Sequence, residues 1–258
     1  MKYLAIIQAR CASTRLPGKI LKDLSGKPAL IRMVERVQRS RLLDEVVVAT
    51  SIDKVNLPVV AICADHGIRV FVGSEDDVLD RIFQAAKLFH PEYVVRLTAD
   101  CPCFDPSLLD EALSELKSES DYLGMMSESF PDGLDLEVIR FETLKTAWRE
   151  ARLASQREHA TQFVVSNKTR FRCQNFESKI GDHGNERWTI DEPEDYELVS
   201  RIFEHFAPSG SDALFSYKDV LGFLDENPDL RKINDRFARN EGLAKSLRED
   251  RTVDWEGE

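Results

Sequence analysis

Apolar runs alternate with amphipathic stretches through the first 117 residues of the chain. Four short runs, rich in branched or aromatic side chains, are typical of β-strands: 4–9, 45–50, 69–72 and 93–97. Three longer stretches repeat apolar residues every three or four positions, as helices with one buried face do: 28–37, 77–89 and 108–116. This strand–helix alternation predicts an α/β fold around a mostly parallel sheet.

The pattern is less regular in the second half of the chain. We expect three further strands and two further helices there: strands at 134–139, 171–175 and 187–190, and helices at 141–154 and 194–206. Residues 207–212 are rich in Pro, Ser and Gly and predict a linker. Beyond it, Ser216 and Asp219 are spaced as the cap of a short helix. We therefore divide the chain into a main domain, 1–207, and a helical extension packed on it, 208–258, with a frayed acidic end at 251–258.

Composition and charge limit the function. The 258 residues include 35 Lys and Arg against 46 Asp and Glu, a net charge of −11. Such a charge argues against general binding of nucleic acid or of an anionic membrane, so a basic cluster should be local and directed at a small anion. The five cysteines are scattered and predict free thiols in a reducing compartment. No apolar stretch approaches the about 18 residues of a membrane span and no secretory signal is visible, so we expect a cytoplasmic protein.

The loop after the first expected strand carries the clearest chemistry. Within ten positions it combines three cations, two hydroxyls and a glycine: Arg10, Arg15, Lys19, Ser13, Thr14 and Gly18. Ligands of open α/β sheets bind at the carboxyl ends of the strands, and cations with backbone N–H groups suit a polyphosphate. The loop matches neither phosphate-binding glycine motif, G-x-x-x-x-G-K-[ST] or G-x-G-x-x-G. From the spacing alone, a solvated loop whose arginines pair with surface acids is as well supported as a polyphosphate-binding loop.

Two charged residues mark the fourth expected strand. Asp100 follows its carboxyl end, where a carboxylate suits Mg²⁺, an ion that prefers oxygen ligands and keeps waters and phosphates for the rest. The alternative is a turn or cap aspartate before Pro102. Arg96 lies inside the strand among apolar residues, so it either faces the site or pairs with a nearby acid.

The second half offers residues for an acceptor pocket. Asp132 opens a turn, and Asp135 and Glu137 follow on one face of the expected strand. These acids could bind sugar hydroxyls, an ammonium group or metal, or form the solvated face of an edge strand.

A helical pair supplies a second kind of acceptor chemistry. Arg157 offers an anion-binding fork and His159 a possible proton acceptor, although a lone histidine is more often structural. Arg187 and Trp188 precede Asp191 closely enough to line the same pocket.

Five ordered motifs and a tail motif resemble one family along nearly the whole chain. They lie at 10–19, 98–102, 132–138, 157–159 and 188–195, with Asn-Glu-Gly-Leu at 240–243 and Ser246 nearby. Together they resemble the sugar cytidylyltransferases, the group of the CMP-Kdo and CMP-sialic acid synthetases, and most closely the branch of the spore-coat polysaccharide protein SpsF.

The resemblance implies a fold and a set of site residues. The fold is three-layered and nucleotide-diphospho-sugar transferase-like (Rossmann-like), with a mostly parallel mixed sheet and a C-terminal helical extension. The implied nucleotide-binding residues are Gln8, Ala9, Arg10, Ser13, Thr14, Arg15, Lys19, Ser74, Asp77, Arg81 and Thr98. The implied catalytic group is Arg10, Arg15, Lys19 and Asp100, and Asp191 joins Asp100 as a metal ligand unless it caps the following helix. The implied acceptor-binding residues are Asp132, Asp135, Glu137, Arg157, His159, Arg187 and Trp188.

The same resemblance implies the reaction. A CTP- and Mg²⁺-dependent cytidylyltransferase would load a small acidic, ulosonic-acid-like sugar, release pyrophosphate, serve surface polysaccharide synthesis and act as a homodimer. One alternative keeps the nucleotide but takes a polyol phosphate or an aminoalkylphosphonate as acceptor. The acidic bias of the acceptor residues disfavours such a dianion. An alternative of another class is a non-catalytic nucleotide-binding protein.

Overall fold

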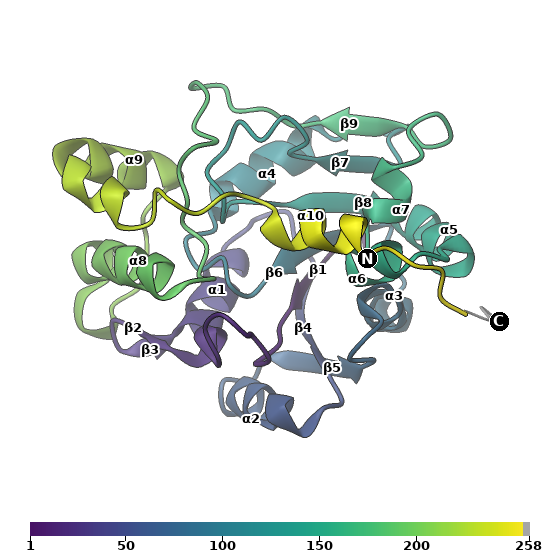
Figure 1. The fold of residues 1–258 in the computed structure, drawn as a ribbon, viewed down its shortest axis with the longest axis horizontal. Coiled ribbons are helices and arrows are strands. Elements are labelled where there is room, and N and C mark those ends of the chain that lie inside the picture. Colours follow the sequence, from purple (N-terminus) through teal and green to yellow (C-terminus); the bar gives the residue numbers. More distant parts are fainter. Residues whose placement is uncertain (255–258) are drawn as a thin grey trace.

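A mixed sheet of seven strands forms the centre of the protein (Figure 1). The computed structural model describes residues 1–254. The strands, in spatial order, are β5 (Arg69–Gly73), β4 (Glu45–Ser51), β1 (Tyr3–Gln8), β6 (Tyr93–Thr98), β8 (Glu137–Arg140), β7 (Tyr122–Gly124) and β9 (Cys173–Asn175). The first four run parallel and β8 runs antiparallel to both of its neighbours. The mostly parallel mixed sheet predicted from the sequence is confirmed.

Helices cover both faces of the sheet and make three layers. One face packs against α1 (Ala29–Val37), α2 (Leu57–Asp65), α4 (Pro106–Glu115), α8 (Pro193–Phe206) and α9 (Tyr217–Glu226). The other packs against α3 (Val78–Phe89), α5 (Phe141–Glu150) and α7 (Gln162–Val165), with α6 (Ala154–Glu158) beside α3. The remaining elements are the hairpin β2 (Asp23–Leu24) and β3 (Lys27–Pro28), the 3₁₀ turns η1 (Lys19–Leu21), η2 (Lys54–Asn56), η3 (Pro208–Gly210) and η4 (Pro228–Ile233), and α10 (Glu241–Arg248).

The period of two along each strand explains the two packed faces. In β1, Ala5 and Ile7 join the cluster that includes α1, whereas Leu4 and Ile6 join the cluster that includes α3. All four side chains are fully buried, because a central strand of a parallel sheet is covered on both sides. The polar ends of β1 and β6 are therefore the first places where side chains can meet a ligand.

Two buried arginines of α1 fasten the segment that follows α8. Arg36 donates hydrogen bonds to the carbonyl oxygens of Ala213 (2.7 Å) and Phe215 (2.8 Å). Arg32 donates to the carbonyl oxygen of Ser211 at 2.6 Å. The end of the segment at 207–212 and the residues that follow it are thus hydrogen-bonded to α1. The division into 1–207 and 208–258 stays a prediction.

Three of the expected elements differ from the structure. The strand expected at 187–190 is wrong: its backbone N–H groups at Trp188 and Ile190 donate to carbonyls of two loops, those of Asp132 and Asp100. The helix expected at 141–154 is interrupted after Glu150 and resumes as α6. The strand expected at 134–139 begins only at Glu137, where pairing with β6 begins.

Several elements carry no prediction from the sequence: α2, β7, the β2–β3 hairpin and α10. The capping of α9 is confirmed, since the Asp219 carboxylate accepts from the Ser216 hydroxyl at 2.7 Å. Of the tail expected to be frayed, 251–258, the last four residues lie outside the described residues. Across residues 1–254, the helices are all too short or too polar to cross a bilayer.

Candidate active site

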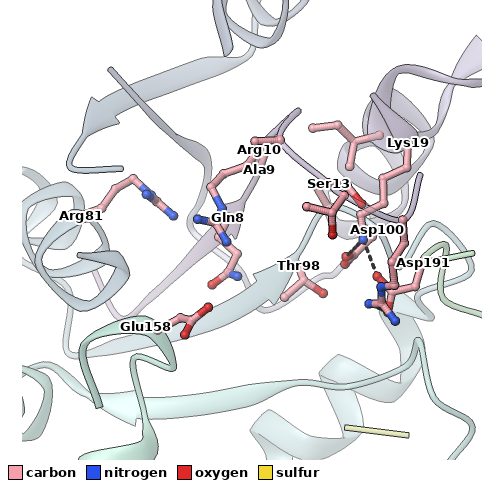
Figure 2. A pocket seen from close by; sticks show the side chains of 15 residues that line it. Gln8, Ala9, Arg10, Ser13, Lys19, Arg81, Thr98, Asp100, Glu158 and Asp191 are labelled. Atoms are coloured by element: carbon pink, nitrogen blue, oxygen red, sulfur yellow. Dashed lines mark hydrogen bonds and ion pairs between the residues drawn. The ribbon is translucent and has the colours of Figure 1, made fainter. Parts of the chain in front are cut away.

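Two cavities adjoin at the carboxyl ends of β1 and β6. The first, about 420 Å³, lies under the loop between β1 and η1 and is shown in Figure 2. That loop folds into a tight turn, in which the N–H of Gly18 donates to the Cys11 carbonyl at 3.1 Å and Gly18 takes a left-handed backbone, φ 66°. All of the nucleotide-binding residues implied by the sequence line this cavity except Ser74 and Asp77. We call it the nucleotide cavity.

Lys19 bridges the two expected metal ligands. Its ammonium group lies 2.5 Å from an Asp100 carboxylate oxygen and 2.6 Å from one of Asp191. Burial would lower the pKa of Lys19, but the two carboxylates outweigh burial and raise it above its usual range. Burial likewise opposes ionisation of Asp100, and Lys19 lowers the pKa of that carboxyl to about 2. The Lys19 ammonium group therefore occupies the position between the two carboxylates.

Divalent metal fits the same two carboxylates. Within the part of the chain that the structure describes, no group of three or more His, Cys, Asp or Glu side chains is placed to hold an ion. Mg²⁺ needs no such group, because it commonly binds through one or two carboxylates and completes its shell with water and phosphate oxygens. Asp100 and Asp191 face each other across one ammonium ion, so their charge and spacing suit a cation shared with a polyphosphate.

Arg81 lies at the other end of the nucleotide cavity. Its side chain is fully buried, and one guanidinium nitrogen donates to the carbonyl of Ser74. The Nε and the second terminal nitrogen are buried without a hydrogen-bond partner. Burial, reinforced by the charge of Arg10, lowers the pKa of Arg81 to about 10. Unpaired buried donors at a cavity wall are suited to an acceptor group on a ligand.

Ser74 and Asp77 lie behind Arg81 rather than in the cavity wall. The Asp77 carboxylate caps α3 by accepting from the Asp80 N–H at 2.8 Å. It also pairs with Arg157 at 2.5 Å. The structure therefore does not bring Arg157 together with the other expected acceptor residues, because it lies with Asp77 in a separate cavity.

The second cavity, about 330 Å³, shares Asp100 and Asp191 with the first. We call it the acceptor cavity. Four of the expected acceptor residues line it: Asp132, Asp135, His159 and Arg187. The Trp188 side chain is fully buried and does not line this wall.

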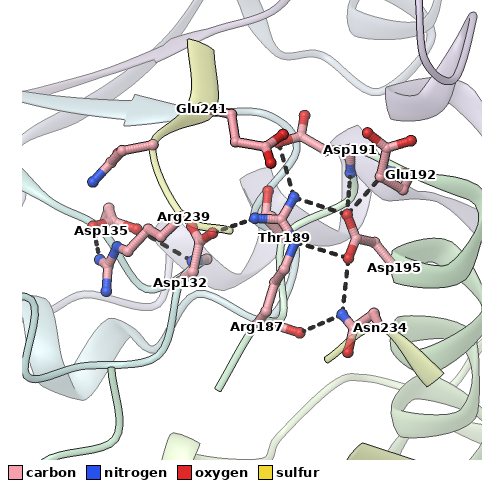
Figure 3. Close-up of polar contacts among 12 residues, drawn as sticks. Asp132, Asp135, Arg187, Thr189, Asp191, Glu192, Asp195, Asn234, Arg239 and Glu241 are labelled. Atoms are coloured by element: carbon pink, nitrogen blue, oxygen red, sulfur yellow. Dashed lines mark hydrogen bonds and ion pairs between the residues drawn. The ribbon is translucent and has the colours of Figure 1, made fainter. Parts of the chain in front are cut away.

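Arg187 organises the acidic side of the acceptor cavity (Figure 3). It donates to Asp132 at 2.5 Å, to Asp191 at 3.2 Å and to both oxygens of Asp195 at 2.9 and 3.0 Å. Asp195 is fully buried and also accepts from the side-chain amide of Asn234 at 2.8 Å. Because three carboxylates share one guanidinium, negative charge is in excess here, and Arg187 has its pKa raised by those acids despite burial.

Asp132 is the most strongly perturbed acid of this group. Burial raises the pKa of Asp132, and the charge of Asp135 adds to it, so that the pKa reaches about 6 although Arg187 opposes the shift. A carboxyl with this pKa changes charge just below neutral pH.

Glu137 is bound on several sides. Arg96 donates to its carboxylate at 2.6 Å, and the hydroxyls of Tyr122 and Thr161 donate as well. Burial raises the pKa of Glu137, but Arg96 outweighs it and the pKa falls below its usual value. Arg96 also donates to the Gln8 side-chain oxygen at 2.9 and 3.0 Å. Glu137 lines neither cavity, but through Arg96 it is connected to Gln8, which lines both.

Some residues at these cavities carry no prediction from the sequence. Glu158 lines the nucleotide cavity, whereas its neighbours Arg157 and His159 are predicted to bind the acceptor. The acceptor cavity further includes Thr161, Gln162, Thr189 and residues 238 and 240–243. The tail motif at 240–243 was the available signal for the last group, but nothing in the sequence shows where it lies.

Three comparisons with known proteins agree. A family model described as "Cytidylyltransferase" matches residues 4–219. The spore coat polysaccharide biosynthesis protein SpsF of Bacillus subtilis is 34% identical over 233 residues, 88% of this chain and 95% of that protein. The 3-deoxy-manno-octulosonate cytidylyltransferase of Geobacter sulfurreducens is 41% identical over 118 residues, 45% of this chain and 46% of that enzyme. The solved structure of a cytidylyltransferase from Leptospira borgpetersenii superposes with a TM-score of 0.85 at 31% identity, covering 93% of this chain and all of that one.

Proposed function

Because this chain belongs to the cytidylyltransferase family, we propose that it joins CTP to a hydroxyl of an acidic, ulosonic-acid-like sugar and releases pyrophosphate. We further propose that the product serves surface polysaccharide synthesis. One observation carries the proposal: the two cavities share the carboxylates of Asp100 and Asp191, with Arg10 and Lys19 in one cavity, the acidic cluster of Arg187 in the other, and Arg15 in both. A nucleotide and an acceptor placed in them would meet at that pair.

The nucleotide half rests on the loop cations. Arg10, Arg15 and Lys19 line one cavity, and three cations there would neutralise a triphosphate and offset the charge that develops on departing pyrophosphate. In the free protein Arg15 pairs with Asp191 at 3.1 Å and Lys19 with both carboxylates. A triphosphate would compete for these cations.

Base selection rests on Arg81 and Glu158. Figure 2 places both at the end of the cavity away from Lys19. The Watson–Crick edge of cytosine carries two acceptors, O2 and N3, and one donor, the N4 amino group. The two unpaired donors of Arg81 match the acceptors once this buried side chain turns toward the cavity, and the Glu158 carboxylate matches the donor. Uracil has a donor at N3 and an acceptor at O4, so this pair would disfavour it.

We propose that Asp100 and Asp191 hold Mg²⁺ together with the triphosphate. When bound, the metal would supply positive charge to the α-phosphate and the leaving pyrophosphate. The carboxylate of Asp100 is ready for this role, because its low pKa keeps it ionised at neutral pH.

The acceptor half rests on orientation. An in-line attack of a sugar hydroxyl on the α-phosphorus needs the two substrates held in one geometry more than it needs covalent help from the protein. Asp132 and Asp135 would accept hydrogen bonds from sugar hydroxyls in the acceptor cavity. Burial lowers the pKa of His159, so its ring is neutral near pH 7 and able to take a proton.

The test is a pyrophosphate-release screen of the four nucleoside triphosphates with Mg²⁺ against three acceptor classes: ulosonic acids, polyol phosphates and aminoalkylphosphonates. We expect release with CTP and an ulosonic acid. Preference for a phosphate or phosphonate would contradict the proposed acceptor. Calorimetric binding of CTP without release in any combination would indicate a non-catalytic nucleotide-binding protein. The homodimer and the cytoplasmic location stay predictions.

A further inference from the structure

A C-terminal strap, residues 238–250, lies across the acceptor cavity. It contains α10, which Figure 1 shows in yellow across the middle of the molecule, over the region where β1 and β6 end. Its lining residues are Ala238, Asn240, Glu241, Gly242 and Leu243. The other lining residues include Asp132 and Asp135, and Asp100 and Cys101 in the loop after β6. The strap thus completes a cavity that the rest of the chain leaves open.

The strap is not a part of the hydrophobic core. None of the eight residues of α10 is buried, and Leu243 is half-buried against the cavity. Its start is held by polar contacts instead: Arg239 pairs with Asp135 and donates to the Phe130 carbonyl at 2.7 Å. Asn240 has a left-handed backbone, φ 59°, that turns the chain into α10. An element that contributes so little apolar burial has little to add to stability, which points to a role at the cavity.

The far end of the strap is tied to α6. The Ser246 hydroxyl donates to a Glu158 carboxylate oxygen at 2.8 Å and lies 3.0 Å from the His159 ring nitrogen. Four residues later, the Asp250 carboxylate accepts from the Ser155 hydroxyl at 2.7 Å. Glu158 and His159 line the nucleotide and the acceptor cavity respectively. The strap is therefore hydrogen-bonded to residues of both cavities.

The strap brings a different chemistry to the cavity. Most of the other lining side chains are charged or hydrogen-bonding, whereas Ala238 and Leu243 are aliphatic. A sugar has hydroxylated edges and a face of C–H groups, and such a face packs favourably on an aliphatic side chain. We propose that the strap is the wall that selects the acceptor, with Leu243 packed on the C–H face of the sugar while Asp132 and Asp135 of the same cavity bind its hydroxyls. This inference rests on the proposed function.

The strap lies in a different part of the chain from the residues that line the nucleotide cavity. Every residue that lines the nucleotide cavity lies within 4–219, the part that the family model matches, whereas the strap lies beyond it. Leu243 lines the acceptor cavity and not the nucleotide cavity, so changes in Leu243 should alter the KM for the acceptor and not the KM for CTP. A purely structural role for the strap would alter both, through the contacts with Glu158 and Arg15.

The experiment measures pyrophosphate release by the full chain with CTP, Mg²⁺ and the best ulosonic acid of the screen, starting with 3-deoxy-manno-octulosonate. Leu243→Ala should raise the acceptor KM about three- to tenfold, the effect of losing one half-buried aliphatic contact, and leave the KM for CTP within about twofold. Leu243→Met should restore most of the loss. Leu247→Ala is the matched control, because Leu247 lies one turn later on α10, is 46% exposed and does not line the cavity.

The outcomes separate the strap from the proposed function. An unchanged acceptor KM in Leu243→Ala overturns the inference, and so does an equal rise in both KM values. Calorimetric titration of CTP alone checks the nucleotide site without any acceptor and should give the same affinity for both alanine variants. A wild-type protein that releases no pyrophosphate with any acceptor overturns the proposed function and, with it, this inference.

Discussion

Asp100→Asn separates the contribution of this carboxylate to catalysis from its contribution to folding. The substitution removes one negative charge beside Lys19 and keeps the shape of the side chain. Lys19 is not left unpaired, since Asp191 lies 2.6 Å away and the new amide oxygen can still accept a hydrogen bond. We expect the fold to survive and the reaction to be lost.

The structure sets the size of the folding effect. Lys19 lowers the Asp100 pKa from its ordinary 3.8 to about 2. At about 1.4 kcal/mol for each pKa unit, the ionised carboxylate contributes on the order of 2 kcal/mol. This stability is present above about pH 4 and is lost as the pH falls through the lowered pKa. Losing a group that stabilises charge in the transition state typically costs about 10²- to 10³-fold in rate. The catalytic loss should thus far exceed what partial unfolding could cause.

The assay pairs two measurements on each variant: kcat from Mg²⁺-dependent pyrophosphate release, and the free energy of unfolding from urea denaturation. Asp105→Asn is the matched control. Its carboxylate is also buried and follows five residues later, but it caps α4 by accepting from the Ser107 N–H at 2.8 Å and lines neither cavity. The other Asp105 oxygen accepts from the Tyr217 N–H at 2.9 Å, and the new amide group would leave that donor unpaired. This control should therefore lose about 1–3 kcal/mol of stability and keep its kcat.

One result would refute the reasoning directly: an Asp100→Asn protein that is folded and keeps more than a tenth of the wild-type kcat. An equal loss of kcat in Asp105→Asn would show that any disturbance of this loop stops the reaction, and would remove the special role of Asp100.

Three further predictions concern neighbouring charges. Arg81→Met should weaken CTP binding at least about tenfold by calorimetry and change the free energy of unfolding by less than about 1 kcal/mol, because no carboxylate hydrogen-bonds this buried guanidinium within residues 1–254. Asp195→Ala should lower the free energy of unfolding, measured by urea denaturation, by about 3–5 kcal/mol. The substitution leaves Arg187 buried with one acid fewer and removes the hydrogen bond that Asp195 accepts from the Asp191 N–H. Asp132→Asn should change how stability depends on pH. The pKa of about 6 means that the folded protein holds this proton more tightly than the unfolded chain, so the contribution of Asp132 to stability falls by up to about 3 kcal/mol as the pH rises from about 4 to 6, and the variant lacks this contribution. Parallel pH dependence of the two proteins would contradict the last.

The parts of the fold that sequence predicts best are those with one strong period. The runs that become β1, β4 and β6 are mostly apolar, because these central strands are covered on both faces, and α1 and α3 each show one apolar stripe. The run that becomes β5 is also mostly apolar, although this edge strand has no fully buried residue. Residues 187–190 are equally buried but form no strand, since they run between two loops and their N–H groups bond there. A buried strand and a buried loop segment both have few polar residues, so the hydrophobic pattern does not distinguish one from the other.

The residues of the site likewise include some that the sequence predicts and some that it does not. The phosphate-loop residues are adjacent in the chain, so a local pattern was enough to group Arg10, Arg15 and Lys19. The strap offers no comparable signal: α10 has no buried stripe, and its contacts join residues about ninety to more than a hundred positions apart, such as Ser246 with Glu158 and Arg239 with Asp135. Pairings of that kind depend on the whole fold.

The hydrogen bonds of the two α1 arginines determine where the chain can be shortened. Arg32 and Arg36 are fully buried, and the carbonyls that accept from them include those of Ser211, Ala213 and Phe215. A chain cut after residue 207 would lose these acceptors and leave Arg32 with only the carbonyls of Leu24 and Ser25, and Arg36 with only those of Cys103 and Phe104. Loss of hydrogen-bond acceptors from two guanidinium groups in the core is destabilising. The first 207 residues therefore need the next eight as hydrogen-bond acceptors, and the shortest autonomous nucleotidyltransferase unit extends at least to Phe215.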